Sequence, residues 1–277
     1  MSLPSISARF WGVRGSIPCP GPDTVRYGGN TSCVEIRCGH QVLIFDAGTG
    51  IRPLGNALLA AGIPTDTDIF LSHCHLDHLI GLPFFAPLHK EGICIRIWAS
   101  NLKPATDAED AVRRMMSHPF FPIEIDVLKS EVEFRDFRAG DTFNPRPGIT
   151  MRTAPLNHPG GATGYRVDHA GRSVAYITDT AFGNGLVDQT MLSLAKDASL
   201  IIIDSTYTDQ ELPSHVGWGH SSWQQCIRLA NAAGAERLCL FHHDPGHDDA
   251  TMDEIAKAAC AVRPGTIVAR EGLLIEL

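Results

Sequence analysis

The sequence has no apolar run long enough to cross a membrane, and it carries little charge. Its longest apolar stretches, such as Ser199 to Ile203, are far short of the roughly 20 residues that a membrane helix needs. Charged residues make up 19% of the chain, below the quarter that is typical of soluble domains. Hydrophobic residues make up 44%, which is enough for a sizeable core and excludes a disordered or fibrous chain.

Basic residues are also in deficit, with 23 Lys and Arg against 31 Asp and Glu. The resulting net charge of −8 does not attract phosphate polymers, so we expect no long nucleic acid as a partner. The amino-terminal residues lack the basic-then-apolar layout of a secretory signal, and the eight cysteines include no C-x-x-C pair. We therefore expect a cytoplasmic protein with reduced thiols and no membrane partner.

Repeats, low-complexity tracts and linkers are absent, so residues 1–277 are expected to form a single domain. Strand-like runs alternate with helical ones, which is typical of layered α/β proteins with mixed sheets. The strand-like runs are 6–11, 33–37, 41–45, 68–71, 93–98, 131–137, 149–154, 164–167, 173–178, 200–203 and 237–241. The helical runs are 51–61, 79–89, 106–116, 189–196, 221–233 and 249–262.

Several apolar strands stop on a residue that can ionise or bind a metal. These residues are Asp46, His73, Asp179, Asp204 and His242. In layered α/β folds, functional sites collect at the carboxyl ends of strands, where side chains leave the core together. One Asp at such a place is usually a turn or cap residue. Five such residues in one chain indicate a site.

The densest group of these side chains lies in LSHCHLDHLIG, residues 71–81. His73 and His75 are two residues apart, so they face the same side of an extended backbone. Asp77 and His78 follow as the chain turns toward a helix. Imidazole and carboxylate both suit zinc, and one turn cannot direct all four groups at a single ion. We therefore expect two ions, with the histidine pair on one and Asp77 with His78 on the other.

The HCHLDH segment resembles the signature of the metallo-β-lactamase-fold hydrolases. The family's other motifs occur in the right order along nearly the whole chain: Asp46 in FDAGTG, His158 in NHPGG, Asp179 in ITDT and His242 in LFHHDP. The resemblance implies an α/β (α+β layered) fold, the αββα sandwich of two mixed β-sheets flanked by helices. It also implies two divalent metal ions, with zinc as the first expectation and manganese or iron as alternatives.

The resemblance further implies a ligand set for each ion. The ligands are His73, His75 and His158 for the first ion, Asp77, His78 and His242 for the second, and Asp179 as a bridge. Asp46 would orient a ligand from behind. His243 is an adjacent alternative to His242 that spacing does not exclude, and we favour His242 because it directly ends its strand.

Two further segments resemble the phosphodiesterase branch, which contains tRNA-processing nucleases and small-substrate relatives. GWGHSSW, residues 217–223, lies between the fourth and fifth motifs, and the resemblance implies that His220 protonates the leaving oxygen. Taken alone, His220 equally fits a residue that merely precedes a serine cap. The opening segment resembles that of bacterial phosphodiesterases. Its Arg14, Arg26 and Asn30 are candidates to donate to a phosphate or base, or members of a β-turn meander.

Two departures from the nucleases point to a smaller substrate. Only twenty residues separate His158 from Asp179, which leaves no room for the long basic arm of the tRNA-processing enzymes. DSTYTD stands where those enzymes carry a histidine, and its Asp204 and Tyr207 are candidates for a substrate contact. We therefore expect a small phosphodiester substrate, such as a cyclic nucleotide or cyclic phosphate. A hydroxide activated by the two metals and oriented by Asp77 would attack it.

Two other functions stay open. A thioesterase or lactonase of the same fold would depend little on His220, and a metal-dependent nucleotide-binding module would bind a nucleotide with weak or no catalysis. The stretch at about 101–146 is longer than a minimal fold requires and contains the apolar cluster MMSHPFFPI. We expect this insertion to cap the active site or to form a homodimer contact, with plain core packing as the alternative.

Overall fold

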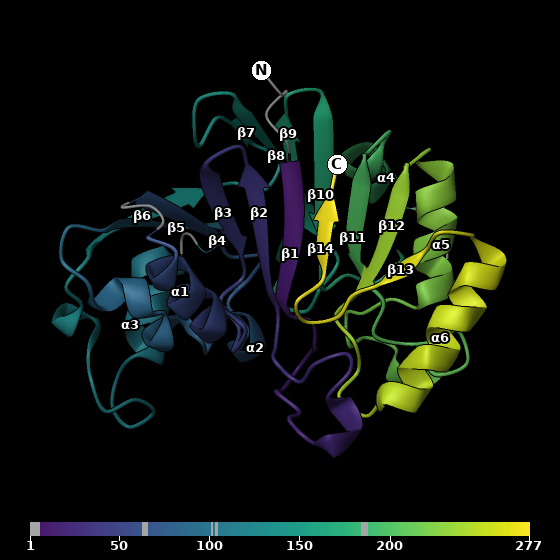
Figure 1. Cartoon of the computed structure of the whole chain (residues 1–277), viewed down its shortest axis with the longest axis horizontal. Helices are drawn as coiled ribbons and strands as arrows, with labels where there is room; N and C mark the ends of the chain where they lie inside the picture. Colours follow the sequence, from purple (N-terminus) through teal and green to yellow (C-terminus); the bar gives the residue numbers. More distant parts are fainter. Residues whose placement is uncertain (1–5, 63–65, 101, 103–104, 184–187) are drawn as a thin grey trace.

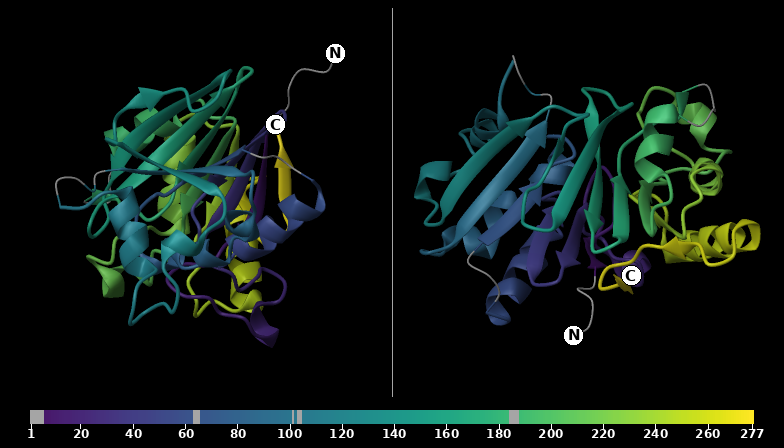
Figure 2. Two further views of the ribbon diagram at one scale, coloured as in Figure 1. Left: turned by 90° about the vertical axis from the view of Figure 1, so that its left-hand side faces the viewer. Right: turned by 90° about the horizontal axis from the view of Figure 1, so that it is seen from above.

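The computed structural model describes residues 6–62, 66–100, 102, 105–183 and 188–277 (Figure 1). In this part of the chain, fourteen strands form two seven-stranded sheets. The helices lie on the outer faces, with α1 to α3 on one side of the molecule and α4 to α6 on the other (Figures 1 and 2). The expected sandwich of two mixed sheets flanked by helices is confirmed.

The first sheet has the order β14-β1-β2-β3-β4-β5-β6. Strands β3 to β6 run parallel to one another, and the pairs from β3 back to β14 are antiparallel. Its strands are β1 (Ile6–Gly12), β2 (Cys33–Cys38), β3 (Gln41–Phe45), β4 (Asp66–Phe70), β5 (Cys94–Ser100), β6 (Glu131–Phe137) and β14 (Leu274–Glu276). Its flanking helices are α1 (Ile51–Ala60), α2 (Leu76–Leu79) and α3 (Ala108–Met115).

The second sheet has the order β13-β12-β11-β10-β9-β8-β7. Strands β10 to β13 are parallel, and the pairs from β10 to β7 are antiparallel. Its strands are β7 (Thr142–Phe143), β8 (Ile149–Leu156), β9 (Ala162–His169), β10 (Arg172–Ile177), β11 (Leu200–Asp204), β12 (Arg237–Phe241) and β13 (Ile267–Val268). Its flanking helices are α4 (Gln189–Ala195), α5 (Trp223–Ala232) and α6 (Asp249–Val262).

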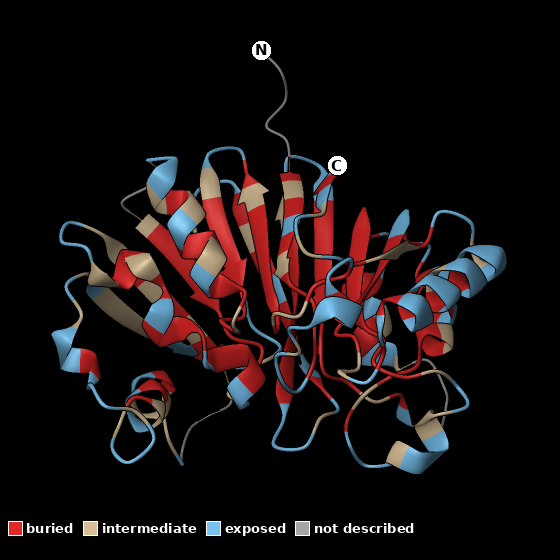
Figure 3. Cartoon of the chain, turned by 60° about the horizontal axis from the view of Figure 1, so that its bottom comes forward, coloured by how far each residue is buried: buried red, intermediate tan, exposed pale blue. Residues whose placement is uncertain are grey.

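The core between the sheets is aromatic, and the buried strands that form it stand out in Figure 3. The ring of Phe45 lies 5.3–5.4 Å from the rings of Phe70, Tyr165 and Tyr176, so it contacts side chains of both sheets. Separate apolar clusters join each sheet to its helices. This packing fixes the spacing of the sheets, and it brings the carboxyl ends of their parallel strands to one edge of the sandwich.

Helix boundaries follow local chemistry. Helix α5 begins with a capping box, in which Ser222 and Gln225 each accept a hydrogen bond from the other's backbone N–H. The helix expected over 79–89 is wrong: α2 is a single turn, followed by the 3-10 turns η2 (Leu82–Phe84) and η3 (Ala86–His89). Pro83 and Pro87 lack the N–H donors that a continuous helix needs. Within the described ranges, no helix is long and apolar enough to span a bilayer.

The stretch at about 101–146 supplies elements of both sheets. Residues 101, 103 and 104 lie outside the described residues; the remainder contains α3, the 3-10 turn η4 (Ile125–Val127), β6 and β7. Phe121 packs on Phe84, with ring centroids 5.9 Å apart, whereas Phe120 is 85% exposed. Part of the segment is therefore core, and its roles as a cap or dimer contact stay predictions.

Candidate metal centre

The predicted site residues follow the parallel strands of both sheets. Asp46 and His73 come after β3 and β4; Asp179 follows β10, Asp204 ends β11 and His242 follows β12. Asp46, Asp179 and His242 have φ values of 61°, 51° and 61°, in the left-handed region that non-glycine residues rarely adopt. Such strained backbone is common at functional sites, and here it occurs at equivalent strand ends of both sheets.

The first group consists of His73, His75 and His158, which we call site A. His158 Nε2 lies 3.1 Å from His75 Nδ1. His73 Nε2 and His158 Nε2 each lie 3.7 Å from Asp179 Oδ2. Ligands bound at 2.0–2.2 Å around a tetrahedral zinc stand roughly 3.4 Å apart, so these four atoms are spaced to hold one ion.

The second group consists of Asp77, His78 and His242, which we call site B. His78 Nε2 lies 3.1 Å from Asp77 Oδ2 and 3.3 Å from His242 Nε2. His242 Nε2 lies 3.4 Å from the same Asp77 oxygen. Site B therefore has the spacing of a second cation site, and it has a carboxylate of its own.

Asp179 faces both sites. Its Oδ2 is directed at site A, whereas its Oδ1 lies 3.2 Å from His78 Nε2 and 3.1 Å from His242 Nε2 in site B. Burial opposes the charge on this carboxylate, but His242 and His78 outweigh burial and hold the pKa of Asp179 well below its usual range. An ionised carboxylate whose two oxygens face different sites is suited to bridge two cations.

Asp46 orients ligands of both sites from behind. This fully buried carboxylate lies 2.8 Å from His78 Nδ1, and it accepts a hydrogen bond from the Ser72 hydroxyl, which in turn lies 3.0 Å from His73 Nδ1. The Tyr176 hydroxyl also donates to it. These contacts assign a proton to each Nδ1, so each Nε2 faces the metal site and offers its lone pair to a metal when it carries no proton. His73 Nε2 is accordingly buried without a hydrogen-bond partner.

Two other imidazoles are fixed in the same way from the second sheet. His158 Nδ1 lies 3.0 Å from the Gly219 carbonyl oxygen, to which it can only donate. His242 Nδ1 lies 3.1 Å from the Thr206 hydroxyl, whose own proton goes to Asp204. Both rings therefore present an unprotonated Nε2 to the site, as metal-binding histidines do.

The charges of the site also fit bound cations. Burial lowers the pKa of His73 and His158, which keeps these imidazoles neutral, the form that binds metals. Burial also opposes a charge on His78, but nearby carboxylates, first Asp179 and then Asp77, outweigh it and raise the pKa of His78 well above its usual value. The carboxylates thus hold a positive charge at this position, and a divalent ion would replace the proton. The donor set, its spacing and its charge all fit two divalent ions.

His220 lies beside both sites, with its ring centroid 5.3 Å from that of His158 and 5.1 Å from that of His242. Its Nδ1 lies 3.0 Å from Asp204 Oδ2. Burial lowers the pKa of His220, but Asp204 outweighs it and raises the pKa to about 9. Asp204, considered from the sequence as a substrate contact, is instead fully buried and positions His220.

The contacts of His243 and Tyr207 show where these two remaining candidates lie relative to the metal centre. His243 Nε2 lies 2.8 Å from the Ala269 carbonyl oxygen, and burial lowers the pKa of His243 to about 3. This side chain is occupied outside the cluster, so the structure brings His242 and not His243 to site B. Tyr207 is buried and stacks on His215, with ring centroids 4.3 Å apart.

The polar residues of the opening segment are structural in this fold. The buried Arg14 guanidinium donates to backbone carbonyl oxygens, Arg26 pairs with Asp253 at 2.6 Å, and Asn30 donates to Glu271 at 3.0 Å. Arg14 Nη2 is buried without a hydrogen-bond partner among the described residues, but the polar contacts that these three side chains make are internal and do not support contact with a phosphate or base. The alternative, a turn meander held by internal contacts, describes them better.

The same segment contributes residues that sequence reasoning missed. The Ser16 N–H donates to Asp77 Oδ2 at 2.8 Å, which fixes a site B carboxylate. A Cβ atom on Gly15 would lie 2.4 Å from the imidazole of His242, so only glycine fits there. The backbone of this glycine-rich segment therefore approaches a site B histidine closely.

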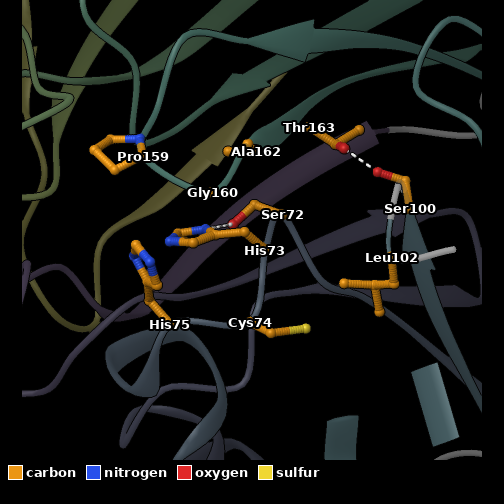
Figure 4. Close-up of a pocket in the computed structure, with 11 residues that line it drawn as sticks. Ser72, His73, Cys74, His75, Ser100, Leu102, Pro159, Gly160, Ala162 and Thr163 are labelled. Atoms are coloured by element: carbon orange, nitrogen blue, oxygen red, sulfur yellow. Dashed lines mark hydrogen bonds between the residues drawn. The ribbon is translucent and has the colours of Figure 1, made fainter. Parts of the chain in front are cut away.

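A pocket of about 170 Å³ opens beside site A, and Figure 4 shows its lining. We call it the hydroxyl pocket; it is lined by residues 72–75, Ser100, Leu102 and residues 159–163. The hydroxyls of Ser100 and Thr163 are hydrogen-bonded to each other on one side of the pocket. The imidazoles of His73 and His75 lie on the other side (Figure 4).

Comparison with known proteins agrees with this geometry. The profile of the β-lactamase superfamily domain matches residues 41–243, which include every residue of sites A and B. The chain belongs to the β-lactamase superfamily. Membership in this superfamily, together with the imidazole–carboxylate cluster, supports a metal-dependent hydrolase.

Within the superfamily, the chain is similar to tRNA-processing nucleases. A ribonuclease Z from Myxococcus xanthus (strain DK1622) is 22% identical over 294 residues, covering 90% of this chain and 92% of that protein. A ribonuclease Z from Gemmatimonas aurantiaca is 24% identical over 319 residues, covering 97% and 95%. These similarities place the chain near the nuclease and phosphodiesterase branch.

Solved structures share the fold over nearly the whole chain. YhfI from Bacillus subtilis, a metallo-β-lactamase fold protein, has a TM-score of 0.75 at 18% identity and covers 99% of this chain and 100% of its own. A diphosphatase of the PhnP family has a TM-score of 0.70 at 17% identity, with 98% of each chain covered. Zn²⁺-bound PqqB from Methylobacterium extorquens also reaches 0.70 at 17% identity, covering 98% and 100%.

Proposed function

We propose that this protein is a two-metal phosphodiesterase that cleaves small phosphodiesters such as cyclic nucleotides or cyclic phosphates. The observation that carries the proposal is the division of the Asp179 carboxylate between sites A and B. We propose His73, His75, His158, Asp179 and the residues of site B as the ligands, with zinc as the metal. Bound there, two divalent ions supply Lewis acidity, which lowers the pKa of water and withdraws charge from phosphate oxygens.

His220 is the proposed general acid. Its Nδ1–H donates to Asp204, so the imidazolium holds its second proton at Nε2, next to both sites. With a pKa of about 9, this group is protonated at neutral pH and ready to donate to a leaving alkoxide. The relatives in the nuclease branch support this role, because alkoxide is a poorer leaving group than the thiolate released by a thioesterase.

Asp77 is proposed to have two roles. One carboxylate oxygen belongs to site B and accepts from the Ser16 N–H. Burial opposes its charge, but His78 outweighs burial and holds the pKa of Asp77 well below its usual range. The ionised carboxylate is therefore available to accept a hydrogen bond from the attacking water and to orient it toward phosphorus.

A small substrate is favoured by the hairpin between His158 and Asp179. Residues 162–177 form β9 and β10, and Asp168 and Ser173 pair across a short turn. This hairpin fills the interval, so the described residues there extend no arm that could hold the body of an RNA. The net charge of −8 also disfavours binding of a long nucleic acid.

A second candidate is an RNA-processing nuclease, which the similarity to two ribonuclease Z proteins favours. One substrate panel separates the two. Zinc-loaded protein is assayed first with bis(p-nitrophenyl) phosphate, with a chelated control and the His220→Ala variant. Cyclic nucleotides and a precursor tRNA with a 3′ trailer are assayed next.

We expect chelator-sensitive turnover that falls sharply in the variant, and cleavage of cyclic nucleotides without cleavage of the precursor. Cleavage of the precursor alone would favour the nuclease. Turnover of carboxylic esters or thioesters but of no phosphodiester would refute the proposal in favour of a thioesterase or lactonase. Tight nucleotide binding without any turnover would indicate a binding module.

A further inference from the structure

The hydroxyl pocket is bounded by both sheets and by the loop that carries site A. Ser100 ends β5 of the first sheet, and Thr163 lies in β9 of the second. The Thr163 N–H donates to the Ser72 carbonyl oxygen at 2.8 Å, which ties this wall to the strand end that precedes His73. The pocket is therefore built into the frame of site A, and its walls are fixed by main-chain contacts.

Size limits what the pocket can hold. Its volume of about 170 Å³ equals that of roughly six water molecules in the liquid. This space suits a glycerol or a pentose, and the base of a nucleoside would lie outside it. Gly160 and Gly161 form one side with φ values of 82° and 84°, a backbone that side chains rarely adopt, so this wall carries no side chain that narrows the entrance.

Polarity limits the chemical class. Among the described residues lining the pocket, Lys, Arg, Asp and Glu do not occur, and the ionisable groups are the two site A imidazoles and the Cys74 thiol. The Ser100 and Thr163 hydroxyls share one hydrogen bond. The hydroxyl that accepts this bond can still donate its own proton to a ligand, and both oxygens can accept a hydrogen bond from one. The pocket thus offers hydrogen bonds to hydroxyl groups. Among these described side chains, a buried second phosphate would find no Lys or Arg to pair with it.

We propose that the hydroxyl pocket is a subsite for a small, uncharged, hydroxylated group, such as a glyceryl or pentose arm esterified to the phosphate. That this arm belongs to a phosphodiester substrate rests on the proposed function. The pocket lies on the His75 side of the centre, whereas His220 lies near His158 and His242. The subsite therefore lies beside the ester bond that stays intact, and the ester oxygen near His220 is the one released from phosphorus; in a cyclic phosphate both oxygens belong to the same sugar.

The experiment measures equilibrium binding, so that it does not depend on turnover. Isothermal titration calorimetry on zinc-loaded protein compares methyl phosphate, glycerol phosphate and glycerol bisphosphate. We expect glycerol phosphate to bind about tenfold more tightly than methyl phosphate, the gain of one or two hydrogen bonds. The bisphosphate should bind no more tightly than glycerol phosphate, because its second phosphate is excluded from the pocket.

The variants Ser100→Ala and Thr163→Val, separately and together, remove the hydroxyls with little change of shape. They should reduce the tenfold preference to about twofold or less and leave the affinity for methyl phosphate unchanged. Thr150→Val, on β8 at the far end of the β8–β9 pair, is the matched control and should keep the preference. Metal content and circular dichroism establish that each variant is folded. Should Thr163→Val lose zinc, Ser100→Ala alone decides.

Equal affinities for methyl phosphate and glycerol phosphate in the unmodified protein would overturn the subsite. A preference that survives in the hydroxyl variants would also overturn it, as would tighter binding of the bisphosphate. The glycerol preference without turnover of any phosphodiester would retain the subsite and refute the proposed function. Phosphodiester turnover without the glycerol preference would retain the proposed function and refute the subsite.

Discussion

Sites A and B differ in charge and in exposure. Site B has the carboxylate of Asp77, the fully buried imidazoles of His78 and His242, and a backbone N–H from Ser16 behind it. Site A has imidazoles alone, and its His75 is exposed beside the hydroxyl pocket. More negative charge and deeper burial favour slow release of a cation. We therefore expect slow release of a metal from site B, and faster exchange and substrate contact at site A.

The largest effect is expected from Asp179, the residue that the two sites share. Asp179→Asn removes the charge that faces both cations, so we expect loss of at least one ion and a fall in phosphodiester turnover of about a thousandfold, several kcal/mol of transition-state stabilisation. Asp168→Asn, a change on β9 at a carboxylate paired with Arg152, is the control. Mass spectrometry of the bound metal gives the readout. Two retained ions in Asp179→Asn would contradict the bridging role.

The difference between the sites is tested by timed chelation. We expect two phases of zinc loss from the native protein, a fast one from site A and a slow one from site B. His75→Ala should abolish the fast phase and His242→Ala the slow one. The slow phase should quicken as the pH falls, because His78 of site B, whose pKa is raised in the metal-free site, takes up a proton as its ion leaves. A single phase unaffected by His75→Ala would show that the sites are equivalent.

His220 gives a smaller effect that leaves the metals in place. His220→Ala should lower turnover by about 10²–10⁴ with two ions retained, since in the proposed role this side chain supplies only a proton. In the native protein, turnover should fall as the pH rises through the pKa of His220, about 9 in the absence of metal. Ions at Asp179 and Asp77 cancel part of the charge that raises this pKa, so the fall is expected at or below pH 9.

The Asp204→Asn variant tests whether the loss of turnover at high pH reflects deprotonation of His220. Without the Asp204 charge the pKa of His220 falls, so the loss of turnover with rising pH should begin at lower pH. Asp141→Asn, at an exposed carboxylate that accepts from the Arg138 N–H, should leave the profile unchanged. An Asp204→Asn profile identical to that of the native protein would exclude this carboxylate as the group that sets the pKa.

The sequence predicted the layered fold and located the cluster because two of the three residues of site A and two of the three residues of site B lie in one short segment. The HCHLDH segment contains four metal-binding side chains, and their spacing along the chain is enough to predict that they lie close together. The partners from the second sheet, His158, Asp179 and His242, each follow a separate strand, and only the family resemblance connected them. Their convergence depends on the packing of one sheet against the other, which spacing along the chain does not encode.

Other features were missed because their causes are tertiary. Asp204 looked like a substrate contact, since nothing local indicates that it faces His220 across the β11 end. Arg14 looked like an anion-binding donor, although its guanidinium binds carbonyl oxygens about 230 residues away in sequence. The helix expected over 79–89 followed the apolar pattern too far, past two prolines that break it.

The smallest effect is expected from a glycine that supports site A. Gly217 and Gly219 both have a φ of 87°, so an alanine at either position costs about 1–2 kcal/mol of stability. A Cβ on Gly219 would in addition lie 2.4 Å from His158 Nδ1, whereas one on Gly217 meets no atom within 4 Å. Gly219→Ala should therefore weaken zinc binding at site A by about tenfold, as loss of a supporting contact does, and Gly217→Ala should not. Equal zinc affinity in the two variants would mean that the Gly219 contact does not set the position of His158, and that site A tolerates movement of that imidazole.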